Sequence, residues 1–129
     1  MKMDELITDI NENNRSLTTL LNEKNNILAK IQALLDFRAY TKAPLNENQM
    51  DSFSRFSGFY SERAIDLKRT LSELDSGEQL NEAKKALLHN NYNYTAVFDE
   101  LQQFNDILVS AIGCLKNIIE FGYMTLQVL

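Results

Sequence analysis

The sequence contains few of the residues that turn a chain. Its 129 residues include one proline and four glycines. A β-sheet protein needs a turn between successive strands, so this scarcity favours a few long elements, which are helices. No segment alternates apolar and polar residues for long enough to form a strand. The sequence therefore predicts an all-α protein that forms a single helical domain over residues 1–129.

Histidine and cysteine each occur once, as His89 and Cys114. His89 lies in an asparagine-rich segment, and no cluster of histidine, cysteine and carboxylate residues has the spacing of a metal site. Cys114 has no base among its helical neighbours that would activate its thiol. We therefore expect no enzyme activity, no metal ion and no cofactor, and we interpret Cys114 as a small buried hydrophobic residue.

The single cysteine also bears on the compartment of the protein. One cysteine cannot form an intrachain disulfide, which favours a reducing environment. The N-terminal segment Met1–Glu5 lacks the continuous apolar core of a signal peptide, and its acidic residues come early. Together these features predict a cytoplasmic protein.

Positive charge is scarce. Lysine and arginine total 13 against 18 aspartates and glutamates, which gives a formal net charge of −5. From Asn90 onward, Lys116 is the only lysine or arginine. Duplex nucleic acid requires a basic face, which this chain lacks.

A group of aromatic residues could stack on single-stranded nucleic acid, but aromatics at helical spacing are typical of a core. These aromatics are Phe53, Phe56, Phe59 and Tyr60. We expect no nucleic-acid binding.

Apolar residues recur every seven positions between Leu6 and Leu35. They form three neighbouring rows on good helix formers, which predicts one long helix of roughly 45 Å. Lys24 interrupts one row, and Asn13 and Asn14 interrupt the other two. The asparagines predict either looser packing of the first turns or a fixed register. The rows are Ile7, Leu21, Leu28, Leu35; Ile10, Leu17, Ile31; and Leu6, Leu20, Ile27, Leu34.

Three further helical segments follow. The only proline lies in the segment Ala39–Asn46, which predicts a connection whose last residue, Asn46, caps the second helix. The second helix is expected to end at Asp75 before Ser76 and Gly77, and a shorter helix to span Glu78–Leu88. The last helix is expected from about Thr95. These segments predict an antiparallel three- or four-helix bundle with long first and last helices.

The last helix carries two apolar rows, whereas a bundle helix needs only one. Its first row is Phe98, Leu101, Asn105, Leu108, Ile112, Leu115, Ile119, Gly122, Leu126 and Leu129. Its second row is Ile107, Ala111, Cys114, Ile118, Phe121 and Val128, interrupted only by Thr125. A second surface must therefore bury this second row.

Three interpretations could explain what buries the second row. We place first a central helix that the other helices cover on two sides. The second interpretation is a surface for a partner helix or for another copy of the chain. The third is a membrane span, which is disfavoured because Lys116 and Glu120 would lie near the centre of the bilayer.

The pattern also resembles a known family. The similar features are Leu20–Lys24 and Ile27–Leu28 in the first helix, Ser61–Arg63 in the middle, and Asn105, Leu108 and Ile112 in the last helix. In size, acidity and helix pattern, most of the chain resembles the flagellar export chaperones of the FlgN type. The resemblance implies a cytoplasmic, non-catalytic protein that holds the helical end of a secreted client, such as a hook–filament junction protein.

In that family the client binds toward the C-terminal helix. By position, the resemblance implies a partner-binding set on the last helix: Ile107, Cys114, Ile118, Phe121, Met124 and Val128. Methionine and phenylalanine suit a groove that adapts to more than one client. The alternative is a self-associating coiled-coil adaptor or regulatory subunit, in which the same row or the heptads of the first helix form a homodimer.

Overall fold

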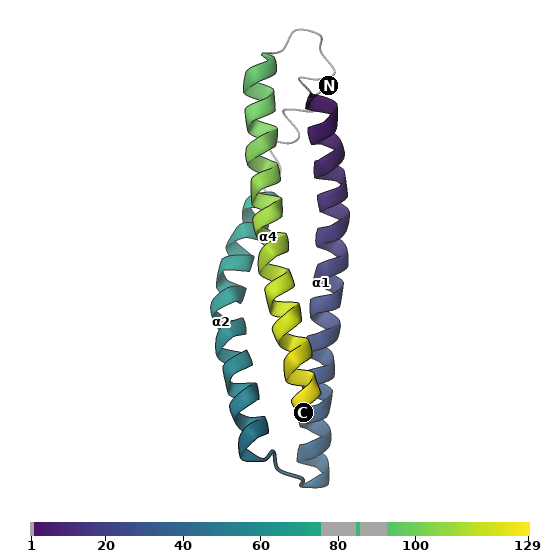
Figure 1. The fold of residues 1–129 in the computed structure, drawn as a ribbon, viewed down its shortest axis with the longest axis vertical. Coiled ribbons are helices and arrows are strands. Elements are labelled where there is room, and N and C mark those ends of the chain that lie inside the picture. Colours follow the sequence, from purple (N-terminus) through teal and green to yellow (C-terminus); the bar gives the residue numbers. More distant parts are fainter. Residues whose placement is uncertain (1, 76–84, 86–92) are drawn as a thin grey trace.

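The computed structural model describes residues 2–75, 85 and 93–129. In this part of the chain the long elements are three helices: α1 (Lys2–Thr41), α2 (Glu47–Asp75) and α4 (Tyr94–Val128). Figure 1 shows α1 and α4 running in the same direction and α2 running in the opposite direction. The predicted all-α class is confirmed. The short helix expected over Glu78–Leu88 lies outside the described residues except for Lys85, and His89 lies outside them too.

The first helix is longer than its apolar rows predicted, since it begins at Lys2 and ends at Thr41. Asp4 and Glu5 lie in its first turn, where carboxylates favour the positive end of the helix dipole. At its other end Lys42 takes a left-handed backbone conformation with φ of 57°. The Ala43 amide then donates to the Arg38 carbonyl at 2.9 Å, and the Lys42 amide to the Ala39 carbonyl at 3.3 Å. This pair of bonds is a Schellman motif, and it ends α1.

Asparagine side chains begin the other two helices. The Asn46 Oδ1 accepts a hydrogen bond from the Gln49 amide at 2.8 Å, and Gln49 Oε1 accepts one from the Asn46 amide at 3.0 Å. These reciprocal bonds form a capping box and confirm Asn46 as the cap of α2. The Asn93 side chain accepts from the Ala96 amide at 3.2 Å and caps α4. Each cap satisfies an amide that the helix leaves unpaired.

The central element is α4, because both α1 and α2 pack on it and their backbones do not approach each other closely. Parallel pairing of α1 with α4 follows from contacts such as Asn13 with Asn105 and Glu23 with Tyr123. The buried hydrophobic side chains come mostly from α4. They are Met3, Leu6, Ile10, Ile27, Ile31, Phe56, Leu67, Val97, Leu101, Phe104, Leu108, Ala111, Ile112, Leu115, Ile118 and Ile119.

The last turn of α4 is held by both other helices. Arg38 on α1 donates a hydrogen bond to the Leu129 carbonyl at 3.1 Å, and Gln49 Nε2 on α2 donates to the Val128 carbonyl at 3.1 Å. These carbonyls have no partner within α4, so the two donors satisfy groups that a helix leaves open. The contacts align the end of α4 with Arg38 and Gln49.

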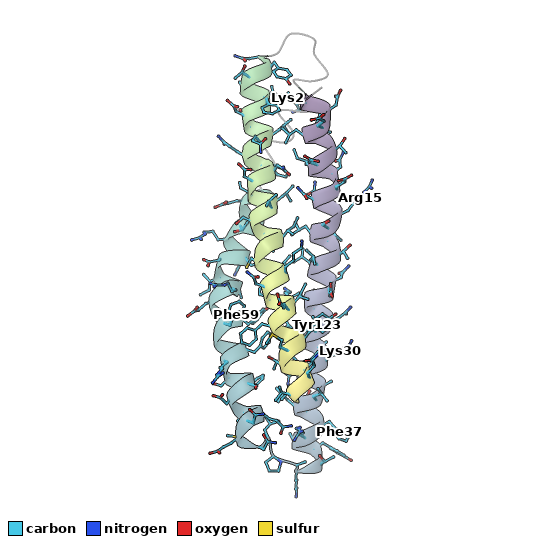
Figure 2. All side chains as sticks on the ribbon, viewed as in Figure 1. Lys2, Arg15, Lys30, Phe37, Phe59 and Tyr123 are labelled. Atoms are coloured by element: carbon cyan, nitrogen blue, oxygen red, sulfur yellow. The ribbon has the colours of Figure 1, made fainter. Side chains whose placement is uncertain are left out.

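Beyond that level, α1 and α2 have no α4 to pack against. Near this end of the bundle Phe37, Tyr40 and Met50 are 64%, 87% and 54% exposed. Figure 2 shows Phe37 near the end of α1, past the last turn of α4. Met50 lies in the first turn of α2, near the end of α4.

Candidate functional site: the groove between α1 and α2

The second apolar row of α4 is covered by α2. Ala111 and Ile118 are each 1% exposed and cluster with Leu67 of α2. Phe121 packs its ring against Phe59, with ring centroids 5.0 Å apart, and against Phe56 at 5.7 Å. A second row on α4 exists because this helix lies between two others. The interpretation that we placed first, a central helix covered on two sides, is the arrangement in the structure.

The residues predicted to bind a partner are therefore not one open surface. Ile118 is fully buried, and Ile107, Cys114, Phe121 and Val128 are partly buried, whereas Met124 is 60% exposed. The structure brings three of them together, because Phe121, Met124 and Val128 line a hollow of about 160 Å³ between α4 and α2. Ser52, Arg55 and Thr125 complete its wall. The buried position of Ile118 corrects the prediction that it contacts a partner.

Cys114 is half-buried beside α2 and has a weak donor contact from its thiol to the Arg63 carbonyl at 3.8 Å. Burial raises the pKa of the Cys114 thiol above its ordinary value, the Arg63 charge partly opposes this, and Asp66 adds to it. A raised pKa keeps the thiol protonated and unreactive. Within the described ranges, no group of three or more histidine, cysteine and carboxylate side chains could hold a metal ion.

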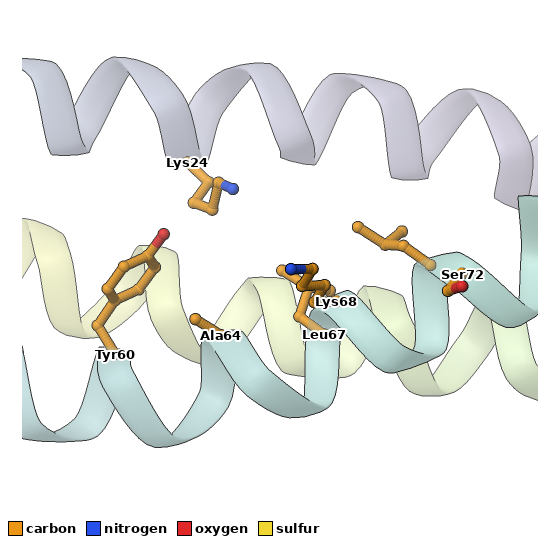
Figure 3. Close-up of a pocket in the computed structure, with 7 residues that line it drawn as sticks. Lys24, Tyr60, Ala64, Leu67, Lys68 and Ser72 are labelled. Carbon is orange, nitrogen blue, oxygen red and sulfur yellow. The ribbon is translucent and has the colours of Figure 1, made fainter.

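Another hollow lies on a different face, between α1 and α2. It is a hollow of about 450 Å³, which we call the α1/α2 groove. It is lined by Lys24, Tyr60, Ala64, Leu67, Lys68, Leu71 and Ser72. Figure 3 shows Lys24 reaching from α1 toward α2, and Tyr60 on α2 with its hydroxyl turned toward α1. Behind these side chains lies α4, whose buried residues Ala111, Leu115 and Ile118 support the floor at Leu67.

The groove follows from the width of the apolar stripe on α1. A helix that packs on one neighbour needs a narrow stripe, and α1 has three rows. Ile27 and Ile31 are buried against α2 and α4. Leu17, Leu20 and Leu21 reach the cluster around Leu67 but remain half-buried. On the opposite wall Tyr60, Leu71 and Leu74 are half-buried too. Of these residues, Tyr60 and Leu71 line the groove, whose apolar lining comes from α2, whereas α1 contributes Lys24 to it.

Two lysines give the groove its charge. Lys24 is half-buried and Lys68 is exposed, and neither has an ion-pair partner among the residues that the structure describes. Nearby arginines differ, because Arg69 pairs with Asp66 at 3.2 Å and Arg55 pairs with Asp51 at 2.9 Å. The groove therefore carries two lysines without an ion pair among the described residues, although the chain has a net charge of −5.

Sequence reasoning missed this groove, although one signal pointed to it. Lys24 interrupts an apolar row between Leu17 and Ile31, and we took the interruption as a defect in the heptads. A lysine can lay its methylene stem along apolar residues while its ammonium reaches water, so such a break marks the edge of a covered surface. Lys68 gave no signal, since a lysine on an exposed helix face is ordinary.

By length and composition alone, α4 could cross a membrane. Its side chains instead pack on α1 and α2, and 39% of its most apolar window is buried inside the protein. A core helix passes the same test of length and composition. Comparison with protein-family models, with curated proteins and with solved structures finds no match to this chain.

Proposed function

We propose that this chain is a non-catalytic protein that holds an apolar helical segment of a partner protein in the α1/α2 groove. The observation that carries the proposal is the open groove itself, which has the half-buried side chains of Tyr60, Ala64 and Leu71 of α2 in its lining, Lys24 of α1 opposite them and α4 behind. A concave and partly apolar hollow between two helices suits a partner helix that packs in a groove. We propose that the three helices form a bundle in which α2 is antiparallel to α1 and α4, and in which a partner helix would occupy a fourth position.

A helix is the partner element that suits this groove best. The apolar residues that line the groove on α2 repeat at helical spacing, as Ala64, Leu67 and Leu71 show. A helix laid between α1 and α2 could insert its own side chains between theirs, in the helix-in-groove mode. An amphipathic helix of about 20 residues is roughly 30 Å long, so it could contact several turns of both walls.

The specific form that we propose is a cytoplasmic export chaperone of the kind implied by the FlgN-type resemblance. Such a protein would bind the helical end of a secreted client, such as a hook–filament junction protein, before export. The hollow at Phe121, Met124 and Val128 would be a secondary contact of the client on α4. Of the set implied by that resemblance, Ile118 is left out of the proposed contact because it is buried.

A designed amphipathic peptide of about 20 residues, labelled with a fluorophore, tests the proposal. We expect it to bind wild-type protein, and we expect Ala64→Trp to abolish binding because the indole fills the groove. Ala64 is half-buried and lines the groove, so this change removes no core atoms. Ala29→Trp is the matched control, since Ala29 is exposed on α1 and does not line the groove.

Equal binding by wild type and Ala64→Trp would place the peptide elsewhere and refute the groove as the site. Sedimentation equilibrium on the pure protein examines the alternative function. A monomer at all concentrations supports the chaperone. A tight dimer that Ala64→Trp dissociates would show that a second copy fills the groove, as in a self-associating adaptor.

A further inference from the structure

We infer that the helix held in the α1/α2 groove is acidic along its flanks, and that Lys24 and Lys68 bind its carboxylates from opposite walls. The inference rests on the proposed function, because it specifies the chemistry of the partner at the same groove. It also goes further, since an apolar groove alone would accept any amphipathic helix.

The two lysines are placed to do this. Lys24 comes from α1 and Lys68 from α2, and both line the same hollow. Figure 3 shows the Lys24 side chain between α1 and α2, and Lys68 beside Leu67 on α2. Their methylene stems border the apolar floor formed by Ala64, Leu67 and Leu71. A partner helix whose apolar face rests on that floor would carry its flanking residues past both ammonium groups.

Nothing in the described chain neutralises these charges. The described ion pairs are Arg55 with Asp51 and Arg69 with Asp66, and both lie within α2. A carboxylate on the partner would give each lysine a counter-ion in a partly desolvated setting, where the attraction is stronger than in bulk water. Tyr60 and Ser72 line the same groove and add hydroxyls that could donate to the same carboxylates.

The negative net charge of the chain restricts where an acidic partner helix can bind. With a net charge of −5, the protein as a whole repels an acidic partner. An acidic helix would therefore be held only where its carboxylates meet Lys24 and Lys68, which fixes its position along the groove. Charged groups at an interface commonly set register and exclude wrong partners in this way.

Two designed peptides with the same apolar face provide the test. One has glutamates flanking that face, and the other has glutamines at the same positions. We expect the glutamate peptide to bind wild type about tenfold more tightly than the glutamine peptide, in fluorescence anisotropy at low salt. We expect Lys24→Gln/Lys68→Gln to remove this preference and leave binding of the glutamine peptide unchanged. Added salt should reduce the preference as well.

Lys30→Gln/Lys116→Gln is the control, because it removes the same charge at exposed positions outside the groove. If this control lowers glutamate-peptide binding as much as the groove variant does, general electrostatics account for the preference and the inference is wrong. If both peptides bind equally to wild type, the inference fails while the proposed function stands. If neither peptide binds, the proposed function itself fails. Circular dichroism confirms that each variant is folded.

Discussion

Asn13 donates a hydrogen bond from its side-chain amide to the side-chain carbonyl of Asn105, with 2.8 Å between nitrogen and oxygen. The bond joins α1 to α4 within the apolar contact between them, and Asn105 is only 8% exposed. Buried polar residues of this kind favour one register, because any slip leaves the amides without partners. Asn13 interrupts an apolar row of α1 for this reason, and Asn105 occupies a position of the first row of α4.

Replacing one of these asparagines should lower the free energy of unfolding more than replacing both. We predict that Asn13→Leu lowers the free energy of unfolding by about 1–3 kcal/mol, because it leaves the Asn105 amide buried and unpaired. Asn13→Leu/Asn105→Leu should recover most of that loss, since two apolar residues then face each other. Urea denaturation of both single variants and the double variant measures the coupling. Strictly additive losses would contradict a register role for the bond.

Gly122 on α4 is packed closely against the Ile27 side chain of α1. A Cβ atom at this position would lie 2.6 Å from Cγ2 of Ile27 and 3.6 Å from the ring of Phe56. We predict that Gly122→Ala destabilises the protein by about 1–3 kcal/mol, because the helices must separate to admit the methyl group.

Gly113→Ala is the matched control for that change. Gly113 lies on the same helix, is exposed, and has no atom within 4 Å of an added Cβ. Alanine is the better helix former, so this variant should gain about 0.5–1 kcal/mol. Thermal melting of both variants checks the pair, and a loss of stability in Gly113→Ala would contradict the packing described for α4.

Phe121 and Met124 were predicted to share one partner surface, but their surroundings differ. Phe121 lies against the rings of Phe56 and Phe59, whereas Met124 is 60% exposed. We predict that Phe121→Asp lowers the free energy of unfolding by about 3 kcal/mol or more, because it loses the ring contacts and places a charge among aromatics. Met124→Asp should change it by less than about 0.5 kcal/mol. Equal effects in denaturant titrations would show that α2 does not cover this part of α4.

Cys114 should be protected from alkylation in the folded protein. Its burial raises the pKa of the thiol, so less thiolate is present at a given pH than in the unfolded chain. We predict that iodoacetamide reacts at pH 8 at least about tenfold faster in denaturant than in native buffer.

The same shift predicts the direction of a change in stability with pH. Because the folded pKa is raised, the unfolded chain loses its thiol proton first as the pH rises past the ordinary thiol value. Stability should therefore fall there, and Cys114→Ala should lack this part of the pH dependence. Equal alkylation rates in native and denaturing buffer would contradict the burial of the thiol.

Local features of the fold were accessible from the sequence because they depend on neighbouring residues. Asn46 was identified as a cap from its place after the only proline, and its side chain forms the capping box of α2. The apolar rows on α1, α2 and α4 follow from a 3.6-residue period that any helix imposes. The ends of α1 were harder to place, since the Schellman motif at Lys42 depends on a left-handed residue that carries no glycine signal.

The candidate site depended on contacts that no local pattern contains. The second apolar row of α4 was visible in the sequence. The helix that buries this row was not, because Phe121 packs against Phe59, which is far from it in the sequence. Similarly, Lys24 was visible as a break in a row, whereas its place opposite Lys68 depends on how α1 and α2 flank α4.

The sequence by itself determined that the chain is helical, where its caps lie and which faces are apolar, because these properties arise within a few turns of one helix. Only the tertiary structure decided which face meets which. It placed α4 at the centre, so that its two rows are both covered, and it left the wide stripe of α1 partly open beside α2. Burial of an apolar face depends on the shape and position of distant segments, which periodicity does not encode.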